Sequence, residues 1–279
     1  MRHLNGPTLR AAPLLPLISS AGRVSLLQAI ALAPVLAVDI ITRGPLVVPM
    51  FVTCLVVALI WENLFAFLRH ADFSFHGLTT AMFVTLFAPL GVEAWQLAVA
   101  VSLGVVLGEL VFGGRGFGFV NPAAAALALL VFSFPQLTLV ASEMTVALAT
   151  LPGAVLLLIA GLISWRVLLA TLLMALAAIG LTSTVWDPIS LAITLSVGLV
   201  FLVADPLGAA CTNSGRWAYG ALAGFLTAVF AGFSMEGLSA EAVVFAALLA
   251  SLFAPLIDHL VVLANAYTRE RRHARGQHG

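Results

Sequence analysis

The chain has 279 residues, of which 62% are hydrophobic and 9% are charged, and its formal net charge at pH 7 is zero. A soluble domain carries about a quarter charged residues, so this composition excludes a soluble globular protein. Apolar stretches recur along the chain without two-residue alternation, which excludes a membrane β-barrel and predicts an all-α polytopic membrane protein.

Ten apolar segments are long enough to be transmembrane helices. They cover residues 24–42, 46–68, 76–92, 94–112, 119–138, 145–163, 167–185, 188–205, 216–234 and 242–264. The chain has no lysine, so arginine alone carries the positive-inside signal. With ten spans and both termini in the cytoplasm, every arginine except Arg43 falls on the cytoplasmic side.

The domain organisation follows from these spans. We expect residues 1–23 to form a cytoplasmic N-terminal tail without a cleavable signal peptide, residues 24–265 to form one transmembrane domain, and residues 266–279 to form a basic cytoplasmic tail. The two cysteines, Cys54 and Cys211, have no spacing typical of a disulfide framework, a zinc site or an iron–sulfur cluster.

An internal similarity links the stretch that begins at Trp95 with the one that begins at Trp186. At an offset of about 94 residues, apolar and small residues match, and both stretches run into a glycine-containing loop with an asparagine. We therefore predict two five-helix repeats, residues 24–138 and 145–264, in opposite orientations. Inverted repeats of this kind place a binding site at their interface, where helices are interrupted.

Two cytoplasmic loops, residues 113–122 and 205–216, are the candidate site. Asn121 is a potential N-cap with Pro122 at the first helical position, which would direct free N–H groups into the loop. Asp205 ends an apolar span and supplies acceptors. Such donors and acceptors suit a planar heterocycle with imide and carbonyl edges, such as a flavin or a quinone.

Simpler explanations exist for each of these polar residues. Asn121 can be a structural cap alone, and Asp205 can pair with Arg216 or be solvated at the membrane interface. Glu109, just before the first loop, can pair with Arg115.

Other ionisable residues have mostly structural interpretations. We expect His76 to lie in a solvated loop, and Asp258 to be a polar residue near a helix end. Asp39 and Glu62 either lie on an ion route, or extend toward the membrane interface, or pair with neighbouring groups.

Three segments carry a family resemblance: "ELVFGGRGFGFVNPA", "ADPLGAACTNSGRWAYG" and "LFAPLIDHLVV". They are similar to the membrane subunit family shared by two bacterial redox pumps, the B subunit of the sodium-pumping NADH:quinone oxidoreductase and the D subunit of the RNF complex. The resemblance extends over residues 57–275. It implies a ten-helix, urea-transporter-like fold of inverted repeats in the bacterial inner membrane, and partner subunits that carry flavin or iron–sulfur clusters. Quinone is a further candidate partner, and no nucleic acid is expected.

The resemblance also implies a riboflavin or FMN held without a covalent bond near the two loops. By position this role falls on Asn121 and Asp205. The remaining candidates are Gly116, Gly118, Phe119, Pro122, Thr212, Asn213 and Gly215. Gly118 stands where the family has a second asparagine.

The family's covalent-FMN motif is missing from this chain. The corresponding region, "FPQLTLVASEMTVALATLPGAVLLL", contains Thr145 and Thr150 but no Ser-Gly-Ala-Thr stretch, so we do not expect covalent FMN.

The sequence therefore favours a non-autonomous subunit of a membrane oxidoreductase that passes electrons through a flavin, with coupling to ion translocation left open. The alternatives are a small-solute channel or carrier on the same scaffold and a cofactor-free assembly anchor.

Overall fold

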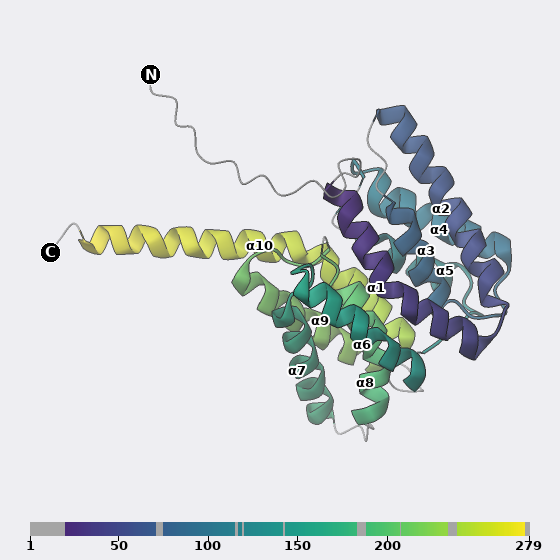
Figure 1. Cartoon of the computed structure of the whole chain (residues 1–279). Helices are drawn as coiled ribbons and strands as arrows, with labels where there is room; N and C mark the ends of the chain where they lie inside the picture. The colour runs from purple at the N-terminus through teal and green to yellow at the C-terminus, as the bar shows by residue number, and fades with distance from the viewer. Residues whose placement is uncertain are drawn as a thin grey trace.

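The computed structural model describes residues 20–70, 75–114, 117–118, 120–141, 143–182, 188–206, 208–233 and 239–276, and these form ten α-helices and their connections, with no strand among them. The helices are α1 (Ser20–Arg43), α2 (Val47–Arg69), α3 (His76–Phe87), α4 (Ala94–Val105), α5 (Pro122–Ser133), α6 (Met144–Ile159), α7 (Trp165–Thr182), α8 (Pro188–Val197), α9 (Asn213–Phe233) and α10 (Ala240–Gly276). Two π-helical turns, η1 (Val106–Leu110) and η2 (Gly198–Val203), continue α4 and α8. The helices pack as a bundle, from which the C-terminal part of α10 projects (Figure 1).

Each predicted span overlaps one of these helices, so the all-α class is confirmed. Three boundaries differ by five residues or more, and one of them is the end of α5, at Ser133 rather than at residue 138. Helix α3 ends at Phe87 rather than at residue 92, because Ala88 has an extended backbone and precedes Pro89, which disfavours helical geometry at the residue before it. Helix α10 continues to Gly276 instead of ending at residue 264.

The helices differ in how far they can reach across a membrane. By length and composition, three segments among the described residues can cross one: Gly22–Arg43, Val47–Arg69 and Ala240–Tyr267. Helix α3 has only 12 residues. At 1.5 Å per residue it extends about 18 Å, less than the roughly 30 Å of a bilayer core. Helix α3 is therefore shorter than the bilayer core, and the extended residues that follow it would have to complete a span.

Helices α4 and α5 meet backbone to backbone through small residues. A Cβ atom added at Gly104 would lie 2.5 Å from the Cβ of Ala126, and one added at Gly108 would lie 2.9 Å from the Cα of Pro122. Small residues allow this close approach between helices in a membrane. The contact fixes η1 against the start of α5, where the first candidate loop ends.

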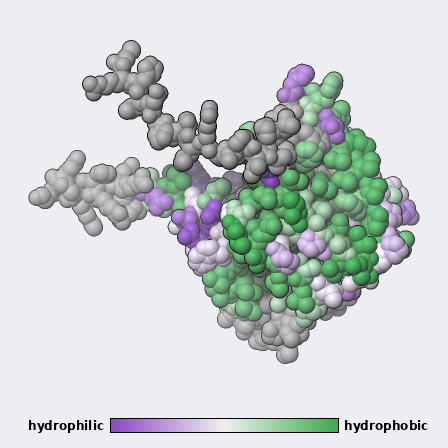
Figure 2. Space-filling model, in the orientation of Figure 1, coloured by the Kyte–Doolittle hydropathy of each residue, from purple (hydrophilic) through white to green (hydrophobic). Residues whose placement is uncertain are grey.

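The surface of the bundle is largely apolar on the face shown in Figure 2. Helix α2 illustrates the pattern, because it exposes an apolar side chain at every fourth position. These exposed residues are Val48, Val52, Val56, Ile60 and Leu64. A continuous apolar stripe of this kind suits contact with lipid rather than with water.

The internal similarity found in the sequence connects α4–η1 with α8–η2. Both members of this pair are α-helices that end in a π-helical turn before a loop. They are four helices apart, whereas five-helix repeats would relate α4 to α9. The similarity therefore reflects a shared type of helix ending and not the predicted repeat.

Candidate functional site

Asn121 caps helix α5 as its position before Pro122 predicts. Its side-chain oxygen accepts hydrogen bonds from the backbone N–H groups of Ala123, at 2.9 Å, and Ala124, at 3.2 Å. Only 4% of the residue is exposed. The side-chain amide nitrogen of Asn121 is a hydrogen-bond donor beside the first loop, so it can bind a carbonyl oxygen of a ligand.

The first loop folds back against η1. A Cβ atom added at Gly118 would lie 2.8 Å from the carbonyl oxygen of Gly108 and 3.4 Å from the Cα of Glu109. Only glycine fits at this position without displacing the backbone of η1. Of the other candidates in this loop, Gly116 and Phe119 lie outside the described residues, as does Arg115.

Asp205 is buried at the end of η2, with 3% of the residue exposed. One carboxylate oxygen accepts from the side-chain amide of Gln28 on α1 at 2.9 Å, and the other accepts from the backbone N–H of Gly208 at 3.0 Å. Solvation at the interface is therefore wrong for Asp205. The Nε of Arg216, its other expected partner, donates to the carbonyl oxygen of Ala210 at 3.4 Å.

The rest of the second loop is held by Asp258 of α10. Its carboxylate accepts from the backbone N–H groups of Cys211, at 2.7 Å, and Thr212, at 2.9 Å, and from the Thr212 hydroxyl. That hydroxyl oxygen in turn accepts from the N–H of Gly215 at 3.1 Å. Asn213 begins α9 and accepts a hydrogen bond from Arg166. Asp258 therefore anchors the second loop and is not simply a polar residue near a helix end. Its position as an acid within an apolar span is the signal in the sequence that could have suggested this anchoring role.

A small cavity lies beside Asp205. Its volume is about 40 Å³, and Ser164, Pro206 and Arg216 are among its lining residues. A cavity of this size has room for a few water molecules, while pockets for drug-sized ligands are about 300–1,000 Å³. A flavin ring does not fit there, and both oxygens of Asp205 already accept hydrogen bonds.

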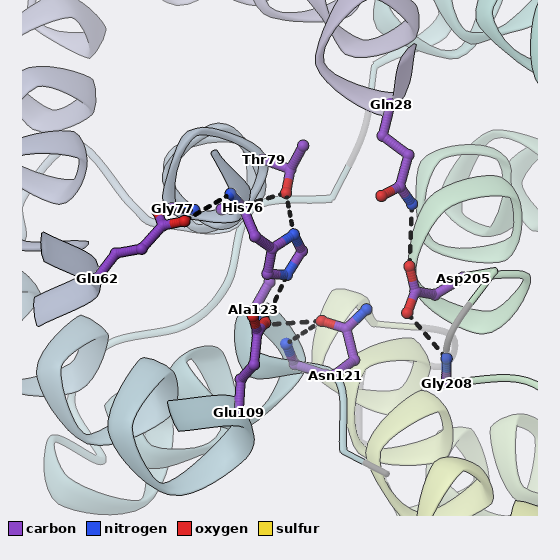
Figure 3. A network of polar contacts seen from close by, with 11 residues as sticks. Gln28, Glu62, His76, Gly77, Thr79, Glu109, Asn121, Ala123, Asp205 and Gly208 are labelled. Carbon is purple, nitrogen blue, oxygen red and sulfur yellow. Dashed lines mark hydrogen bonds and ion pairs between the residues drawn. The ribbon is translucent and has the colours of Figure 1, made fainter. Parts of the chain in front are cut away.

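A second polar cluster lies at the start of α3, as Figure 3 shows. His76 is only 6% exposed, so the expected solvated loop position is wrong. Its Nε2 lies 3.1 Å from a carboxylate oxygen of Glu109, which was expected to pair with Arg115. Glu62 of α2 accepts from the backbone N–H groups of His76, at 3.3 Å, and Gly77, at 3.1 Å.

The remaining buried acid, Asp39, forms an ion pair with Arg43 one helical turn away, at 3.2 Å. The guanidinium of Arg43 also donates to the carbonyl oxygens of Thr85, Leu86 and Ala88, so it caps the C-terminal end of α3. Pairing is therefore the observed alternative for Asp39. Within the described part of the chain, no group of three or more His, Cys, Asp or Glu residues is placed to hold a metal ion.

Comparisons with known proteins agree with one another. The family model described as the NQR2, RnfD, RnfE family matches residues 8–146 and 139–266. The B subunit of the Na(+)-translocating NADH-quinone reductase of Pseudomonas paraeruginosa is 30% identical over 281 residues, covering 80% of this chain and 69% of that protein. The corresponding B subunits of Klebsiella pneumoniae and Chromohalobacter salexigens are 27% identical over 283 residues and 29% identical over 280 residues, respectively. Each covers 80% or 81% of this chain and 68% of the relative.

Proposed function

This chain belongs to the NQR2, RnfD, RnfE family, and from that membership we propose that it is a membrane subunit of an electron-transport complex rather than an autonomous enzyme. The relatives named above are subunits of an NADH-quinone reductase. By analogy, this chain assembles in the bacterial inner membrane with other membrane subunits and with flavin or iron–sulfur subunits. Quinone is the candidate electron acceptor.

The electron carrier in this proposal is a flavin bound without a covalent bond at the first loop. The observation that supports it is the position of Asn121, a buried residue whose oxygen caps α5 and whose amide nitrogen is a donor at the end of the first loop. When bound, a flavin supplies one- and two-electron chemistry. The Asn121 oxygen keeps α5 capped, Gly118 lets the loop lie close to η1, and the helix start at Pro122 directs its dipole toward the loop. Asp205 shapes the second loop through Gln28 and Gly208 rather than contacting the ring.

The proposed architecture has ten spans in two inverted repeats, α1–α5 and α6–α10, with both termini cytoplasmic. Part of the packing pattern supports it, because adding five to the helix numbers converts three contacts of the first half into contacts of the second, whereas the α2–α3 contact has no comparable α7–α8 contact among the described residues. The contacts α1–α3, α2–α4 and α4–α5 correspond to α6–α8, α7–α9 and α9–α10. The contacts α1–α6 and α5–α10 map onto themselves, because each joins two helices that the relation makes equivalent.

An absorbance spectrum of the full-length protein, purified in mild detergent, tests the flavin. We expect flavin absorbance that acid precipitation releases into the supernatant, because no covalent-FMN motif is present. Asn121→Ser separates the two roles of this residue, since serine keeps a capping oxygen and removes the amide donor. The variant should therefore remain folded and lose most of its flavin. Asn63→Ser, on an exposed face of α2, is the matched control and should retain it.

Other outcomes would redirect the proposal. Full flavin retention in Asn121→Ser would show that the ring lies elsewhere. A colourless wild-type protein that moves solute into liposomes would favour the channel or carrier. A colourless protein without flux that still copurifies with partner subunits would favour the assembly anchor.

A further inference from the structure

The cluster at the start of α3 contains three ionisable side chains from three elements: Glu62 of α2, His76 of α3 and Glu109 of η1. Each residue is only 6% exposed. Ionisable residues inside a membrane protein are costly, and they mark functional sites more often than chance positions do. The proposed flavin site uses none of the three.

The imidazole of His76 has a defined neighbour at each nitrogen (Figure 3). Nε2 lies 3.1 Å from a carboxylate oxygen of Glu109. Nδ1 lies 2.7 Å from the hydroxyl oxygen of Thr79. The same hydroxyl oxygen lies 2.8 Å from the carbonyl oxygen of His76. The hydroxyl has a single proton, so it can donate to the ring or to the carbonyl, but not to both.

These contacts accommodate two protonation states of the ring with the same heavy-atom positions. In the first state the Thr79 hydroxyl donates to Nδ1, and Nε2–H donates to the ionised Glu109, so the imidazole is neutral. In the second state the hydroxyl donates to the carbonyl of His76, Nδ1–H donates to the hydroxyl oxygen, and Nε2–H still faces Glu109. The second state holds one more proton. Rotation of one hydroxyl converts the hydrogen-bond pattern from one state to the other.

We propose that His76, Glu109 and Thr79 form a proton-binding site inside the membrane-embedded bundle, which takes up and releases one proton per chain. Histidine suits this role because its ordinary titration range spans neutral pH. The proton adds to Nδ1, where the hydrogen bond with the Thr79 hydroxyl reverses its direction, while the contact between Nε2 and Glu109 is kept.

The neighbouring charges distinguish a proton from a metal ion as the ligand. Glu62 accepts from two backbone amides at the start of α3, while Glu109 faces the imidazole, so the two carboxylates have different partners. Glu62 is stabilised there by the positive end of the α3 dipole as well. The carboxylates are thus not arranged as a pair of oxygen ligands around one cation.

Other charged groups around α3 are few. Among the helices that pack on it, α4 and α5 contain no ionisable residue. Helix α2 contributes Arg69 besides Glu62, and this arginine donates to the carbonyl oxygens of Leu110 and Val111 at the end of η1. Helix α1 contributes Asp39 and Arg43, which contact the opposite end of α3.

The site adjoins the first loop, because Gly118 packs on the backbone of Glu109. A proton bound at His76 changes the charge next to that loop by one unit. In a subunit that carries electrons, this placement would couple proton uptake to the charge of a carrier bound there. Proton binding itself does not depend on the proposed flavin and is measured separately.

Nitrogen-15 NMR of the histidine rings tests the proposal on the full-length chain in lipid bilayers between pH 5 and 9. The His76 signals are assigned by their loss in His76→Gln. We expect His76 to change from two protonated ring nitrogens at low pH to one at high pH. In Glu109→Gln the doubly protonated form should disappear from this range, and net proton uptake should fall by one per chain.

Thr79 provides a second, milder perturbation. Thr79→Val keeps the side-chain shape and removes the hydroxyl, so the ring should lose its titration in this range, and Thr79→Ser should restore it. A His76 ring with the same number of protonated nitrogens from pH 5 to 9 in the wild type would overturn the proposal. Wild-type titration in either Glu109→Gln or Thr79→Val would overturn it as well.

Discussion

The hydrogen bond between Gln28 and Asp205 joins positions 177 residues apart, across the two halves of the chain. Replacing Asp205 with alanine removes the acceptor of Gln28 and of the Gly208 N–H at once. Leaving a buried donor unsatisfied costs about 1–3 kcal/mol, so the two together predict a loss of about 2–6 kcal/mol. Gln28→Ala removes only one of the two bonds and should cost less, about 1–2 kcal/mol.

A double-mutant cycle isolates the contribution of the bond itself. Side-chain hydrogen bonds in a membrane protein average about 0.6 kcal/mol in such cycles and reach about 1.7 kcal/mol. Because Asp205 is ionisable and buried, we expect a coupling near the upper value. The measurement is reversible unfolding of the detergent-solubilised protein, with Gln136→Ala in an exposed loop as the control. Effects of Asp205→Ala and Gln28→Ala that add within about 0.5 kcal/mol would mean that the bond does not tie the halves together.

Three further predictions concern packing and anchoring. Gly224→Ala should lower the thermal unfolding temperature strongly, because the added Cβ would lie 2.3 Å from a backbone oxygen of α7. Gly232→Ala is the control on the same helix, since its added Cβ meets no atom within 4 Å, and it should be neutral or stabilising. Asp258→Asn should make proteolysis of the loop around Thr212 faster. The amide has only one acceptor oxygen for three donors, which are the N–H groups of Cys211 and Thr212 and the Thr212 hydroxyl. A cleavage rate equal to that of the wild type would contradict the anchoring role. Arg43→Gln should accelerate amide hydrogen exchange at the C-terminal end of α3, because the Arg43 guanidinium caps the carbonyl oxygens there. Unchanged exchange would show that water can replace the guanidinium.

Features that depend on neighbouring residues in the sequence could be predicted well. Asn121 followed by Pro122 is a local signal for a helix start, and the cap has the expected hydrogen bonds. The apolar segments likewise predict the helices, because the side chains of a membrane helix contact either other helices or lipid, and both surroundings are apolar. Family membership also followed from local segments, because the two loops and the middle of α10 retain their residue patterns.

Partners from distant parts of the chain could not be predicted. His76 stands in a polar stretch that begins at Arg69, and composition alone cannot tell a solvated histidine from one that begins a buried helix. Its partner Glu109 is on a different helix, and the choice between Arg115 and His76 depends on how α3 packs against η1. The same holds for Gln28, an uncharged residue within an apolar helix, which the sequence offered no reason to pair with Asp205.

The buried acids of this protein show why the His76–Glu109 pair differs from its surroundings. The acids within helices or at their ends that the structure places in the interior are Asp39, Glu62, Glu109 and Asp205. Each has a partner, as burial of a carboxylate requires. Three of the partners keep a fixed protonation state near neutral pH, since they are a guanidinium, backbone amides and a side-chain amide. Among the described partners of these acids, the imidazole that faces Glu109 is the one that can change its charge there while it keeps its contacts. A change of pH, or of charge on a carrier at the neighbouring loop, should therefore be registered first at His76.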